Sequence, residues 1–368
     1  MVKRIIIATG GTGGHIYPAI ALAQQFAKEK NTEILFIGGN LAKNRYFDHS
    51  FQHQSVSCGA FTNKYPHKLL KSCLSICKGI WQSRALINNF NPDIVIGFGS
   101  YYSFPPLVAA KLQGVPILLH EANSIPGKVN KLLAPYSLAT GVNFPQTLNL
   151  LKGTRYEVGM PLRNGFKKGN VPASAARDYY GLSHNVRTLL VFGGSQGANV
   201  ISRAVLEALK LLEMTSVVQV IHITGDLRQQ QELQEQYKNM GIRASVKMFE
   251  ERMDLAWQAA DLVVSRSGAS SVAEQLEFEV PGILIPFAKA ADDHQNHNAD
   301  FLVKTVGGAF KLQERELELS PMKLVKLLKE LLENEGERLQ RMRQSMSEYK
   351  RKARTHDLYS LINTLCMK

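Results

Sequence analysis

One stretch decides the fold: Ser265-Arg266-Ser267-Gly268-Ala269-Ser270-Ser271-Val272-Ala273-Glu274. It follows an apolar run at residues 261–264, whose composition predicts a buried parallel strand. A helix is expected to begin near Ala269, because neither Pro nor Gly follows until Pro281. A strand, a turn of small residues and a helix in this order predict an α/β fold.

The same turn is a candidate anion site. Its small residues let a ligand approach the backbone, and the unpaired N–H groups of a helix's first turn favour a phosphate. Glu274 lies five residues beyond Ala269, where a carboxylate can accept hydrogen bonds from a ribose diol. The alternative is a Ser-capped helix with a solvated glutamate. In both cases we expect Glu274 at the surface, where its loss leaves the fold intact.

The rest of the chain repeats this unit. Each half opens with a strand, a glycine turn and a helix. In the first half we expect the strand at residues 3–9, the turn at 10–15 and a helix that continues to about residue 29. In the second half we expect them at residues 187–192, 193–198 and 199–212. Further apolar runs predict strands at 33–37, 93–97, 115–119, 218–223, 244–249, 262–264 and 282–286. Strands that alternate with helices predict two doubly wound parallel sheets.

The length of 368 residues exceeds the size at which single cores stop growing, which favours two domains. We expect residues 1–163 and 164–340 to form two Rossmann-like domains, linked near residues 158–165. A charged helical segment begins near Glu337. We expect residues 341–368 to return to the amino-terminal domain.

Positive charge is concentrated in the first domain. The formal net charge is +13, and residues 1–163 hold 17 Lys and Arg against 6 Asp and Glu, whereas the remainder holds 27 against 25. This asymmetry predicts a polyanionic partner, either a nucleic acid or an anionic membrane surface. A nucleic-acid-binding protein would interleave aromatic residues with its cations and carry a recognition element. The sequence has neither, so we expect no nucleic acid.

The compartment follows from the cysteines and the apolar runs. The four cysteines (Cys58, Cys73, Cys77 and Cys366) have no zinc or CxxC spacing, which predicts a reducing compartment. No apolar run approaches the ~18 residues that a membrane-spanning helix needs. The short run at residues 5–8 predicts a strand and no signal peptide. We expect a cytoplasmic protein whose membrane contact is peripheral.

Neither glycine turn matches the dinucleotide pattern GxGxxG well. The second predicted strand ends in Ile37-Gly38-Gly39-Asn40, which offers no carboxylate to a ribose. Both features argue against NAD.

Six motifs occur together and in order over nearly the whole chain. They are Gly10-Gly11-Thr12-Gly13-Gly14-His15, residues 97–105, His120-Glu121-Ala122-Asn123, residues 193–198, residues 265–274 and residues 292–299. In this combination the sequence resembles glycosyltransferase family 28, the bacterial enzymes that add N-acetylglucosamine to the muramoyl-pentapeptide of undecaprenyl-pyrophosphoryl lipid. The resemblance implies the GT-B fold, in which two Rossmann-like domains face each other across a cleft with the active site.

The resemblance also implies a biological setting. The substrates would be UDP-N-acetylglucosamine and the lipid-linked muramoyl-pentapeptide, lipid I, which becomes lipid II. The protein would lie at the cytoplasmic face of the inner membrane, as a peripheral enzyme of peptidoglycan synthesis, cell shape and cell division.

Roles are implied for the residues that match the motifs. In the first domain, the residues expected to contact the donor or the acceptor are Thr12, Gly13, Gly14 and Asn123. Arg163 and Ser195 would approach the diphosphate of the donor, and the backbone near Glu250 would contact its uracil. Glu274 would bind the ribose, and Gln295 would bind the sugar hydroxyls. The residues around the α-phosphate would be Ala269, Ser270, Ser271, Val272 and Ala273. This sequence departs from the family pattern at Ala122, where glutamine is commoner, and at Ser100, where a glycine precedes the tyrosine. Ala122 lacks the polar side chain that glutamine would offer a substrate.

The reaction of the family is an inverting transfer, in which the acceptor's 4-hydroxyl attacks the anomeric carbon opposite the departing UDP. Such a reaction needs a base for the hydroxyl proton. His15 is our candidate, because an imidazole ordinarily has a pKa near ~6.5. The alternative role for His15 is to cap the helix or bind a phosphate. Glu121 is the second candidate base, and its alternative role is that of a buried hydrogen-bonding residue.

The departing diphosphate needs stabilisation of its charge. The helix end at Ala269, with Ser195 and Arg163, would supply it without a metal, and no cofactor is expected. Asp292-Asp293 resembles a metal-binding pair, but the family uses this segment to recognise the sugar. We expect one of these two aspartates to cap a helix.

Residues 64–84 predict an amphipathic helix. Its apolar stripe, with Lys68, Lys71, Lys78 and Arg84 alongside, consists of Leu70, Leu74, Cys77 and Trp81. A stripe flanked by cations suits an anionic lipid surface, and the alternative is that it packs on the domain's own sheet. We expect most of the stripe to pack and residues 65–70 to contact the membrane.

The nearest alternative function is that of another GT-B enzyme that acts on a UDP-sugar. A non-hydrolysing UDP-N-acetylglucosamine epimerase is one example, and its product would not be attached to lipid.

Overall fold

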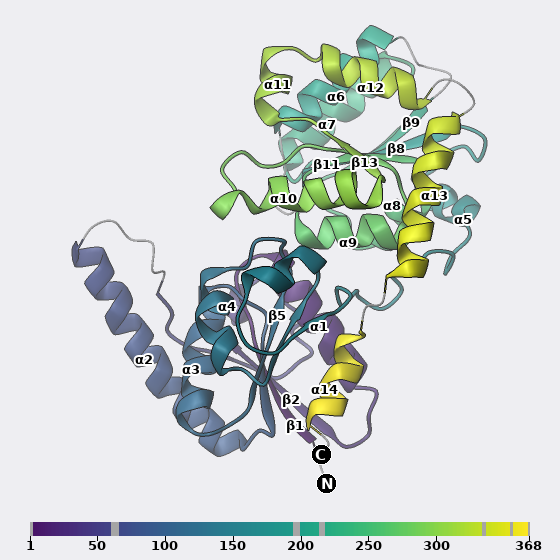
Figure 1. The fold of residues 1–368 in the computed structure, drawn as a ribbon. Coiled ribbons are helices and arrows are strands. Elements are labelled where there is room, and N and C mark those ends of the chain that lie inside the picture. The colour runs from purple at the N-terminus through teal and green to yellow at the C-terminus, as the bar shows by residue number, and fades with distance from the viewer. Residues whose placement is uncertain are drawn as a thin grey trace. The chain divides into compact units, whose positions relative to one another are not determined.

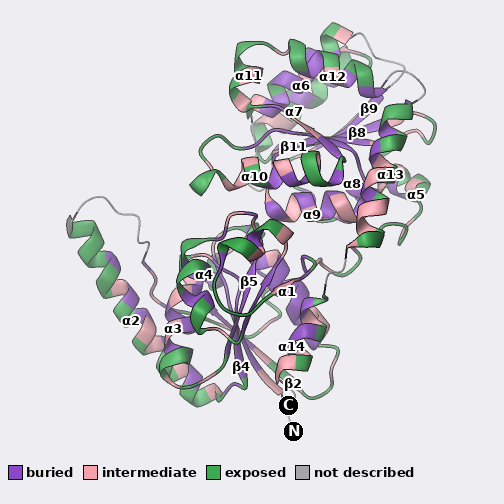
Figure 2. Cartoon of the chain, viewed as in Figure 1, coloured by how far each residue is buried: buried purple, intermediate pink, exposed green. Residues whose placement is uncertain are grey.

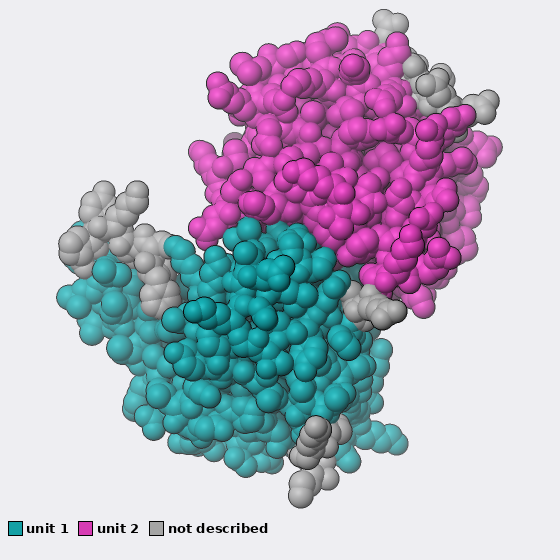
Figure 3. Space-filling view, in the orientation of Figure 1, with its two compact units in different colours: residues 1–164, 354–368 teal, residues 165–353 magenta. Residues whose placement is uncertain are grey.

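The computed structural model describes residues 3–59, 66–193, 199–212, 218–332, 336–353 and 356–366. The chain divides into two compact units (Figures 1 and 3). Unit 1 comprises Met1–Asn164 with Arg354–Lys368, and unit 2 comprises Gly165–Ala353. Each unit is built around one parallel sheet.

The sheet of unit 1 has seven strands, all paired in parallel. Their order across the sheet is β3 (His53–Ser55), β2 (Thr32–Gly38), β1 (Lys3–Ala8), β4 (Ile94–Gly97), β5 (Ile117–Glu121), β6 (Ala139–Val142) and β7 (Arg155–Glu157). The chain moves outward from β1 to β3 and then returns to the other side of β1 with β4. The strand order therefore reverses between β1 and β4.

Helices cover both faces of this sheet. Ile5 and Ile7 of β1 pack with α1 (Gly13–Phe26) and α14 (Leu358–Cys366), whereas Ile6 and Ala8 pack with α3 (Phe104–Leu112) and α4 (Lys128–Leu133). Because both faces are covered, the inner strands β1, β4 and β5 are almost wholly buried (Figure 2) and consist mostly of apolar residues. Short helices are η1 (Leu41–Lys43), η2 (Tyr101–Ser103), η3 (Ala134–Tyr136) and η4 (Pro145–Leu150).

Helix α2 (Pro66–Phe90) exposes the stripe that we expected to pack. Leu70, Leu74, Cys77 and Trp81 are all exposed, and the expectation was wrong. The buried face consists of Ser72, Ile76, Gly79, Ser83 and Ile87. Its small residues let the backbone come close, since a Cβ on Gly79 would lie 1.9 Å from the Ser57 carbonyl oxygen. Lys64 and Tyr65 lie outside the described residues.

Unit 2 repeats the topology with six parallel strands. Their order is β10 (Ala244–Lys247), β9 (Val218–Ile223), β8 (Arg187–Phe192), β11 (Leu262–Ser265), β12 (Gly282–Leu284) and β13 (Ala309–Lys311). The reversal lies between β8 and β11, the counterparts of β1 and β4.

One face of the second sheet packs on helices that share a large apolar cluster with it: α6 (Asn199–Leu212), α7 (Leu227–Asn239), α11 (Glu314–Leu319), α12 (Met322–Leu332) and α13 (Glu337–Lys352). On the other face, Trp257 of α8 (Met253–Ala259) packs edge-on against Phe192. The unit also contains α5 (Ala173–Tyr179), α9 (Ala269–Phe278), η5 (Ala291–Asp293), α10 (His294–Asp300) and η6 (Phe301–Val306).

The end of the chain is shared between the units in a different way from our expectation. Residues 341–368 do not form one segment that returns to unit 1, because α13 belongs to unit 2, where Met342 is buried in its core. Only the part beyond Ala353 joins unit 1, where Leu358 and Ile362 of α14 pack against the first sheet. No helix in the described ranges is long and apolar enough to span a bilayer.

Candidate active site

In unit 1, most of the predicted site residues follow the carboxyl ends of two strands: residues 12–15 come after β1, and Glu121 with Asn123 lies at the end of β5, the neighbour of β4. Ligands of open parallel sheets bind at this edge, where the strand order reverses. The first glycine turn follows β1, and α1 begins there, because the Thr12 carbonyl oxygen accepts hydrogen bonds from the N–H groups of His15 and Ile16. Thr12 and Gly14 are exposed, so this turn is open to a ligand.

A hydrogen bond joins this turn to the loop after β4. His15 Nδ1 lies 2.8 Å from the carbonyl oxygen of Phe98. Because a carbonyl oxygen only accepts, Nδ1 carries the proton, and the neutral ring has its lone pair on Nε2. Gly99 has a φ of +75°, and a Cβ there would lie 3.4 Å from His15 Nδ1. The positive φ, which residues with a side chain rarely adopt, is therefore what favours glycine in the turn after Phe98.

A second histidine lies close by but is inaccessible. His120 is 1% exposed, and its ring lies 5.2 Å from that of Phe98. Burial, with a smaller effect of His15, lowers the pKa of His120 to about 3. His120 is therefore neutral at neutral pH and adds no charge beside His15.

Glu121 is buried at the end of β5 and holds a loop. Its Oε1 accepts from the Asn123 N–H (2.9 Å), and its Oε2 accepts from the Gly127 N–H (2.9 Å) and from Asn130 Nδ2 (2.8 Å). Burial raises the pKa of Glu121, although these hydrogen bonds oppose the shift. The geometry favours the second of the two roles that the sequence left open, a buried residue that shapes the loop carrying Asn123.

Ser100 occupies a backbone conformation that is almost restricted to glycine. Its φ of 65° and ψ of 154° cost about 1–3 kcal/mol for a residue with a side chain. The Ser100 carbonyl oxygen accepts from the N–H and Oγ of Ser103, which holds the turn in place. The Ser100 hydroxyl lies above the first glycine turn, 3.5 Å from where a Cβ on Gly11 would be.

Arg163 lies beside the same glycine turn. Its Cζ is 4.4 Å from the centre of the Tyr17 ring, and Tyr17 follows His15 by two positions on α1. A Cβ on Gly13 would lie 2.8 Å from that ring, so Tyr17 also covers the turn. Sequence reasoning missed Tyr17, because an aromatic residue among the apolar residues of a helix is indistinguishable from a core residue.

Most of the predicted residues of unit 2 that the structure describes lie near the carboxyl end of β11. Helix α9 begins at Ala269, as predicted, and the first hydrogen bond of the helix joins the Val272 N–H to the Gly268 carbonyl oxygen. The N–H groups of Ala269, Ser270 and Ser271 precede that bond, so they point out of the first turn. Val272 is buried and Ala273 is half-buried.

Helix α10 is tied to this turn. Ser267 Oγ donates to the Gln295 carbonyl oxygen (2.7 Å), and Asn298 Nδ2 donates to the Ser267 carbonyl oxygen (3.1 Å). The Gln295 side chain accepts from the Phe287 N–H (3.0 Å) through Oε1. The structure therefore brings Gln295 together with residues 265–274.

Glu274 is not the surface residue that we expected. It is buried, and its Oε2 accepts a 2.8 Å hydrogen bond from Trp257 Nε1. The reason is that α9 packs against three helices, α8, α10 and α13, so more than one side of it is covered. Sequence reasoning missed Trp257, which no motif includes.

Glu250 lies after the edge strand β10 and is also buried. Its carboxylate accepts from the Arg252 N–H (2.8 Å) and from Lys247 Nζ (2.7 Å). The side chain therefore fixes the loop whose backbone we expected to contact the uracil of the donor. Ser195 lies outside the described residues.

The acidic pair Asp292-Asp293 does not cap a helix as expected. Asp293 occupies the N-cap position of α10, but its side chain makes no capping hydrogen bond. The reason is its left-handed backbone (φ 54°), whereas a capping residue is extended. No group of three His, Cys, Asp or Glu that could hold a metal ion occurs within the described ranges.

Comparison with known proteins identifies the family. Residues 5–142 match the N-terminal domain of glycosyltransferase family 28, and residues 188–358 match its C-terminal domain. The chain belongs to glycosyltransferase family 28.

Relatives of this family 28 protein carry one name. A protein of Protochlamydia amoebophila, called UDP-N-acetylglucosamine--N-acetylmuramyl-(pentapeptide) pyrophosphoryl-undecaprenol N-acetylglucosamine transferase, is 51% identical over 318 residues, which cover 86% of this chain and 84% of the relative. A protein of the same name from Halothermothrix orenii is 37% identical over 93% of both chains.

Solved structures share the fold. The crystal structure of Acinetobacter baumannii MurG matches over 100% of both chains, with a TM-score of 0.76 and 24% identity. The structure of Phytolacca americana UGT2 also matches over 100% of both chains, with a TM-score of 0.70 and 14% identity. The expected GT-B class, with two Rossmann-like parallel-sheet units, is confirmed.

The hydrogen bond between Trp257 and Glu274 generates a prediction about stability. Glu274→Ala is expected to lower the free energy of unfolding by about 1–3 kcal/mol, because the Trp257 N–H would be left buried without an acceptor. Glu274→Gln keeps a carbonyl oxygen as the acceptor and should retain most of the stability. Urea unfolding of the wild type and both variants checks this, and an equal loss in both variants would contradict it.

Proposed function

We propose that this protein transfers N-acetylglucosamine from UDP-N-acetylglucosamine to the 4-hydroxyl of the muramoyl-pentapeptide on undecaprenyl diphosphate, and so converts lipid I to lipid II in peptidoglycan synthesis. The observation that carries the proposal is the 51% identity, over 86% of the chain, to a relative named for this transfer. The alternative of a UDP-N-acetylglucosamine epimerase is not favoured by the names of the relatives. The same role implies a contribution to cell shape and division.

Unit 2 would bind the donor. The open N–H groups at the start of α9 suit the α-phosphate, because the helix dipole and unpaired donors both favour an anion. Glu274 would accept from the ribose with the carboxylate that Trp257 orients. Gln295 would contact the sugar hydroxyls, and the backbone near Glu250 would contact the uracil. Ser195 and Arg163 would contact the diphosphate.

Unit 1 would bind the acceptor and supply the base. Thr12, Gly13, Gly14 and Asn123 line the edge of the first sheet, where ligands bind in such folds. His15 would take the proton of the 4-hydroxyl on Nε2, while its Nδ1–H remains bonded to the Phe98 carbonyl oxygen, which stabilises the imidazolium that forms. Glu121 would act as a positioning residue, through the loop that it holds.

Transfer of a radiolabel tests the proposed function. The protein is incubated with labelled UDP-N-acetylglucosamine and a short-chain lipid I analogue, and the label is followed into an organic-extractable product. We expect the label in the lipid fraction only when the acceptor is present. Label that stays in a nucleotide sugar of altered configuration would contradict the transfer and favour the epimerase.

The hydrogen-bonded tautomer of His15 predicts its kinetic effect. His15→Ala is expected to lower kcat by ~10²–10⁴-fold, the usual contribution of a positioned base. The acidic limb of the rate–pH profile should also disappear, because that limb reports protonation of the imidazole. The donor KM should barely change, since the donor residues on α9 and α10 belong to unit 2.

A phosphate-binding role for His15 would have a different signature. The acceptor KM would rise steeply in His15→Ala, while the acidic limb would stay in place. An intact limb would contradict the assignment of His15 as the base.

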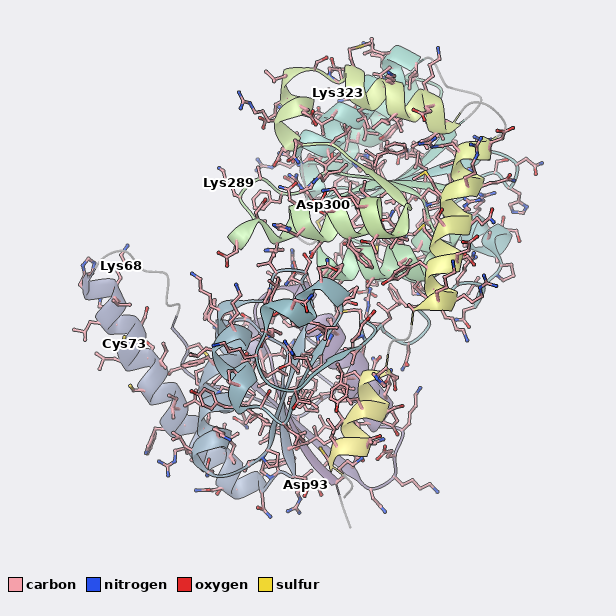
Figure 4. All side chains as sticks on the ribbon, viewed as in Figure 1. Lys68, Cys73, Asp93, Lys289, Asp300 and Lys323 are labelled. Carbon is pink, nitrogen blue, oxygen red and sulfur yellow. The ribbon has the colours of Figure 1, made fainter. Side chains whose placement is uncertain are left out.

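We also propose that α2 docks the protein on the cytoplasmic face of the membrane as a peripheral enzyme. Leu70, Leu74 and Trp81 are 63%, 62% and 73% exposed on one side of the helix. Exposed cations flank them, and two residues of this outer surface, Lys68 and Cys73, are labelled in Figure 4. An apolar stripe with cations beside it suits the interface of a bilayer rich in anionic lipid.

Trp81 supplies a direct measurement of docking. The chain has two tryptophans, and Trp257 is 1% exposed, so a response of fluorescence to vesicles reports Trp81. Phosphatidylglycerol vesicles are expected to shift the emission to the blue and to sediment the protein. Changing Lys68, Lys71 and Lys78 to Glu should abolish both effects, because each cation near the surface contributes about 1 kcal/mol.

The matched control uses three exposed lysines on one helix of unit 2, α12. Changing Lys323, Lys326 and Lys329 to Glu alters the net charge equally and should leave binding to vesicles much stronger than in the α2 variant. Equal losses in the two triple variants would attribute the binding to net charge and contradict docking through α2.

A further inference from the structure

A stack of four side chains joins three segments of unit 1 beside the first glycine turn. Arg163 lies over Tyr17, at 4.4 Å from its ring centre. The rings of Tyr17 and Tyr46 meet edge to face, with centres 5.9 Å apart and an interplanar angle of 75°. Arg45 lies over Tyr46, at 4.8 Å from its ring centre. We call these four residues the tyrosine stack.

The tyrosine stack is fixed to the glycine turn at two points. Asn44 Nδ2 donates to the Gly11 carbonyl oxygen (2.7 Å), and Asn44 Oδ1 accepts from the Tyr46 N–H (3.0 Å). At the second point, the Tyr17 ring covers Gly13 so closely that a Cβ would lie 2.8 Å from it. The two tyrosines are therefore held by α1 and by the loop after β2, and not by the segment that carries Arg163.

Arg163 itself lies in a segment with no regular structure. Residues 161–163 form neither helix nor strand. The next residue, Asn164, contacts α1 through its N–H, which donates to Gln24 Oε1 (3.5 Å). Tyr17 and Gln24 are seven positions apart and so lie on the same side of α1. This side of α1 therefore supports the irregular segment at both residues.

We propose that Tyr17 is a positioning residue that holds the Arg163 guanidinium ready for the diphosphate of the nucleotide sugar. The inference rests on the proposed function, in which Arg163 approaches that diphosphate. A guanidinium that lies on an aromatic face keeps its N–H groups directed outward in its own plane, where they suit phosphate oxygens. Because the ring orders a long, flexible side chain in advance, less entropy is lost when the donor binds. Tyr46, with Arg45 over its own ring, braces Tyr17 through the edge-to-face contact.

A double-mutant cycle tests the inference. The variants are Tyr17→Leu, Arg163→Ala and the pair, and the measurements are the KM for UDP-N-acetylglucosamine and the Kd for UDP by calorimetry. Tyr17→Leu is expected to raise both constants about three- to tenfold, with kcat changed less than twofold. In the Arg163→Ala background the same change should have no further effect, because Tyr17 acts through Arg163. Tyr17→Phe keeps the ring and should restore the wild-type values.

Two further variants keep the test clear. Tyr46→Leu should also raise the Kd for UDP, by a smaller factor than Tyr17→Leu does, and again only when Arg163 is present. Tyr136→Leu, which removes a 59% exposed tyrosine of the same unit, should leave it unchanged. Equal effects of Tyr17→Leu with and without Arg163, or an unchanged Kd in Tyr17→Leu, would overturn the inference. Binding of UDP needs no acceptor, so a wild-type protein without transfer activity would refute the proposed function alone.

Discussion

The hydrogen bond between His15 Nδ1 and the Phe98 carbonyl oxygen is the contact on which the chemistry that we propose for unit 1 depends. It spans the reversal of strand order, from the helix after β1 to the loop after β4. A backbone carbonyl is an acceptor at every pH, so this bond fixes the ring and its tautomer together. The neighbours are compatible with it: Gly99 adopts the positive φ of the turn after Phe98, and His120 is kept neutral by burial.

Three buried carboxylates have a common structural role. Glu121 and Glu250 accept from the N–H groups of the loops that follow their strands, and Glu274 accepts from Trp257. From the sequence, Glu121 was a candidate base and Glu274 a candidate ribose ligand, whereas at Glu250 only the backbone was expected to contact the donor. A buried carboxylate without partners would be costly, whereas one that accepts from fixed N–H groups makes a loop rigid. The three glutamates thus stabilise loops and a helix near the carboxyl ends of the strands in both units. The imidazole of His15 then remains our candidate for proton transfer.

Much of the fold follows from the sequence, because parallel strands buried on both faces are apolar runs and glycine turns mark their ends. The short strands β3, β6, β7 and β13 were missed, since three or four residues carry no periodic signal. At the site, the motifs located the turns at Thr12 and Ala269. They did not reveal the burial of Glu274 or the contact of Tyr17 with Arg163, because both depend on helices and segments distant in sequence.

The two faces of α2 show why the stripe of large apolar side chains did not predict which face of the helix packs on the unit. The helix lies close to its neighbours because Gly79, Ser72 and Ser83 occupy the inner face, and a larger residue at Gly79 would collide with the Ser57 carbonyl. Leu70, Leu74 and Trp81 are left outside. Burial of each such side chain would contribute about 1.5–3 kcal/mol, which the folded unit forgoes at Leu70, Leu74 and Trp81. An apolar surface outside the chain can recover this free energy, and the exposed cations beside the stripe favour one that is anionic.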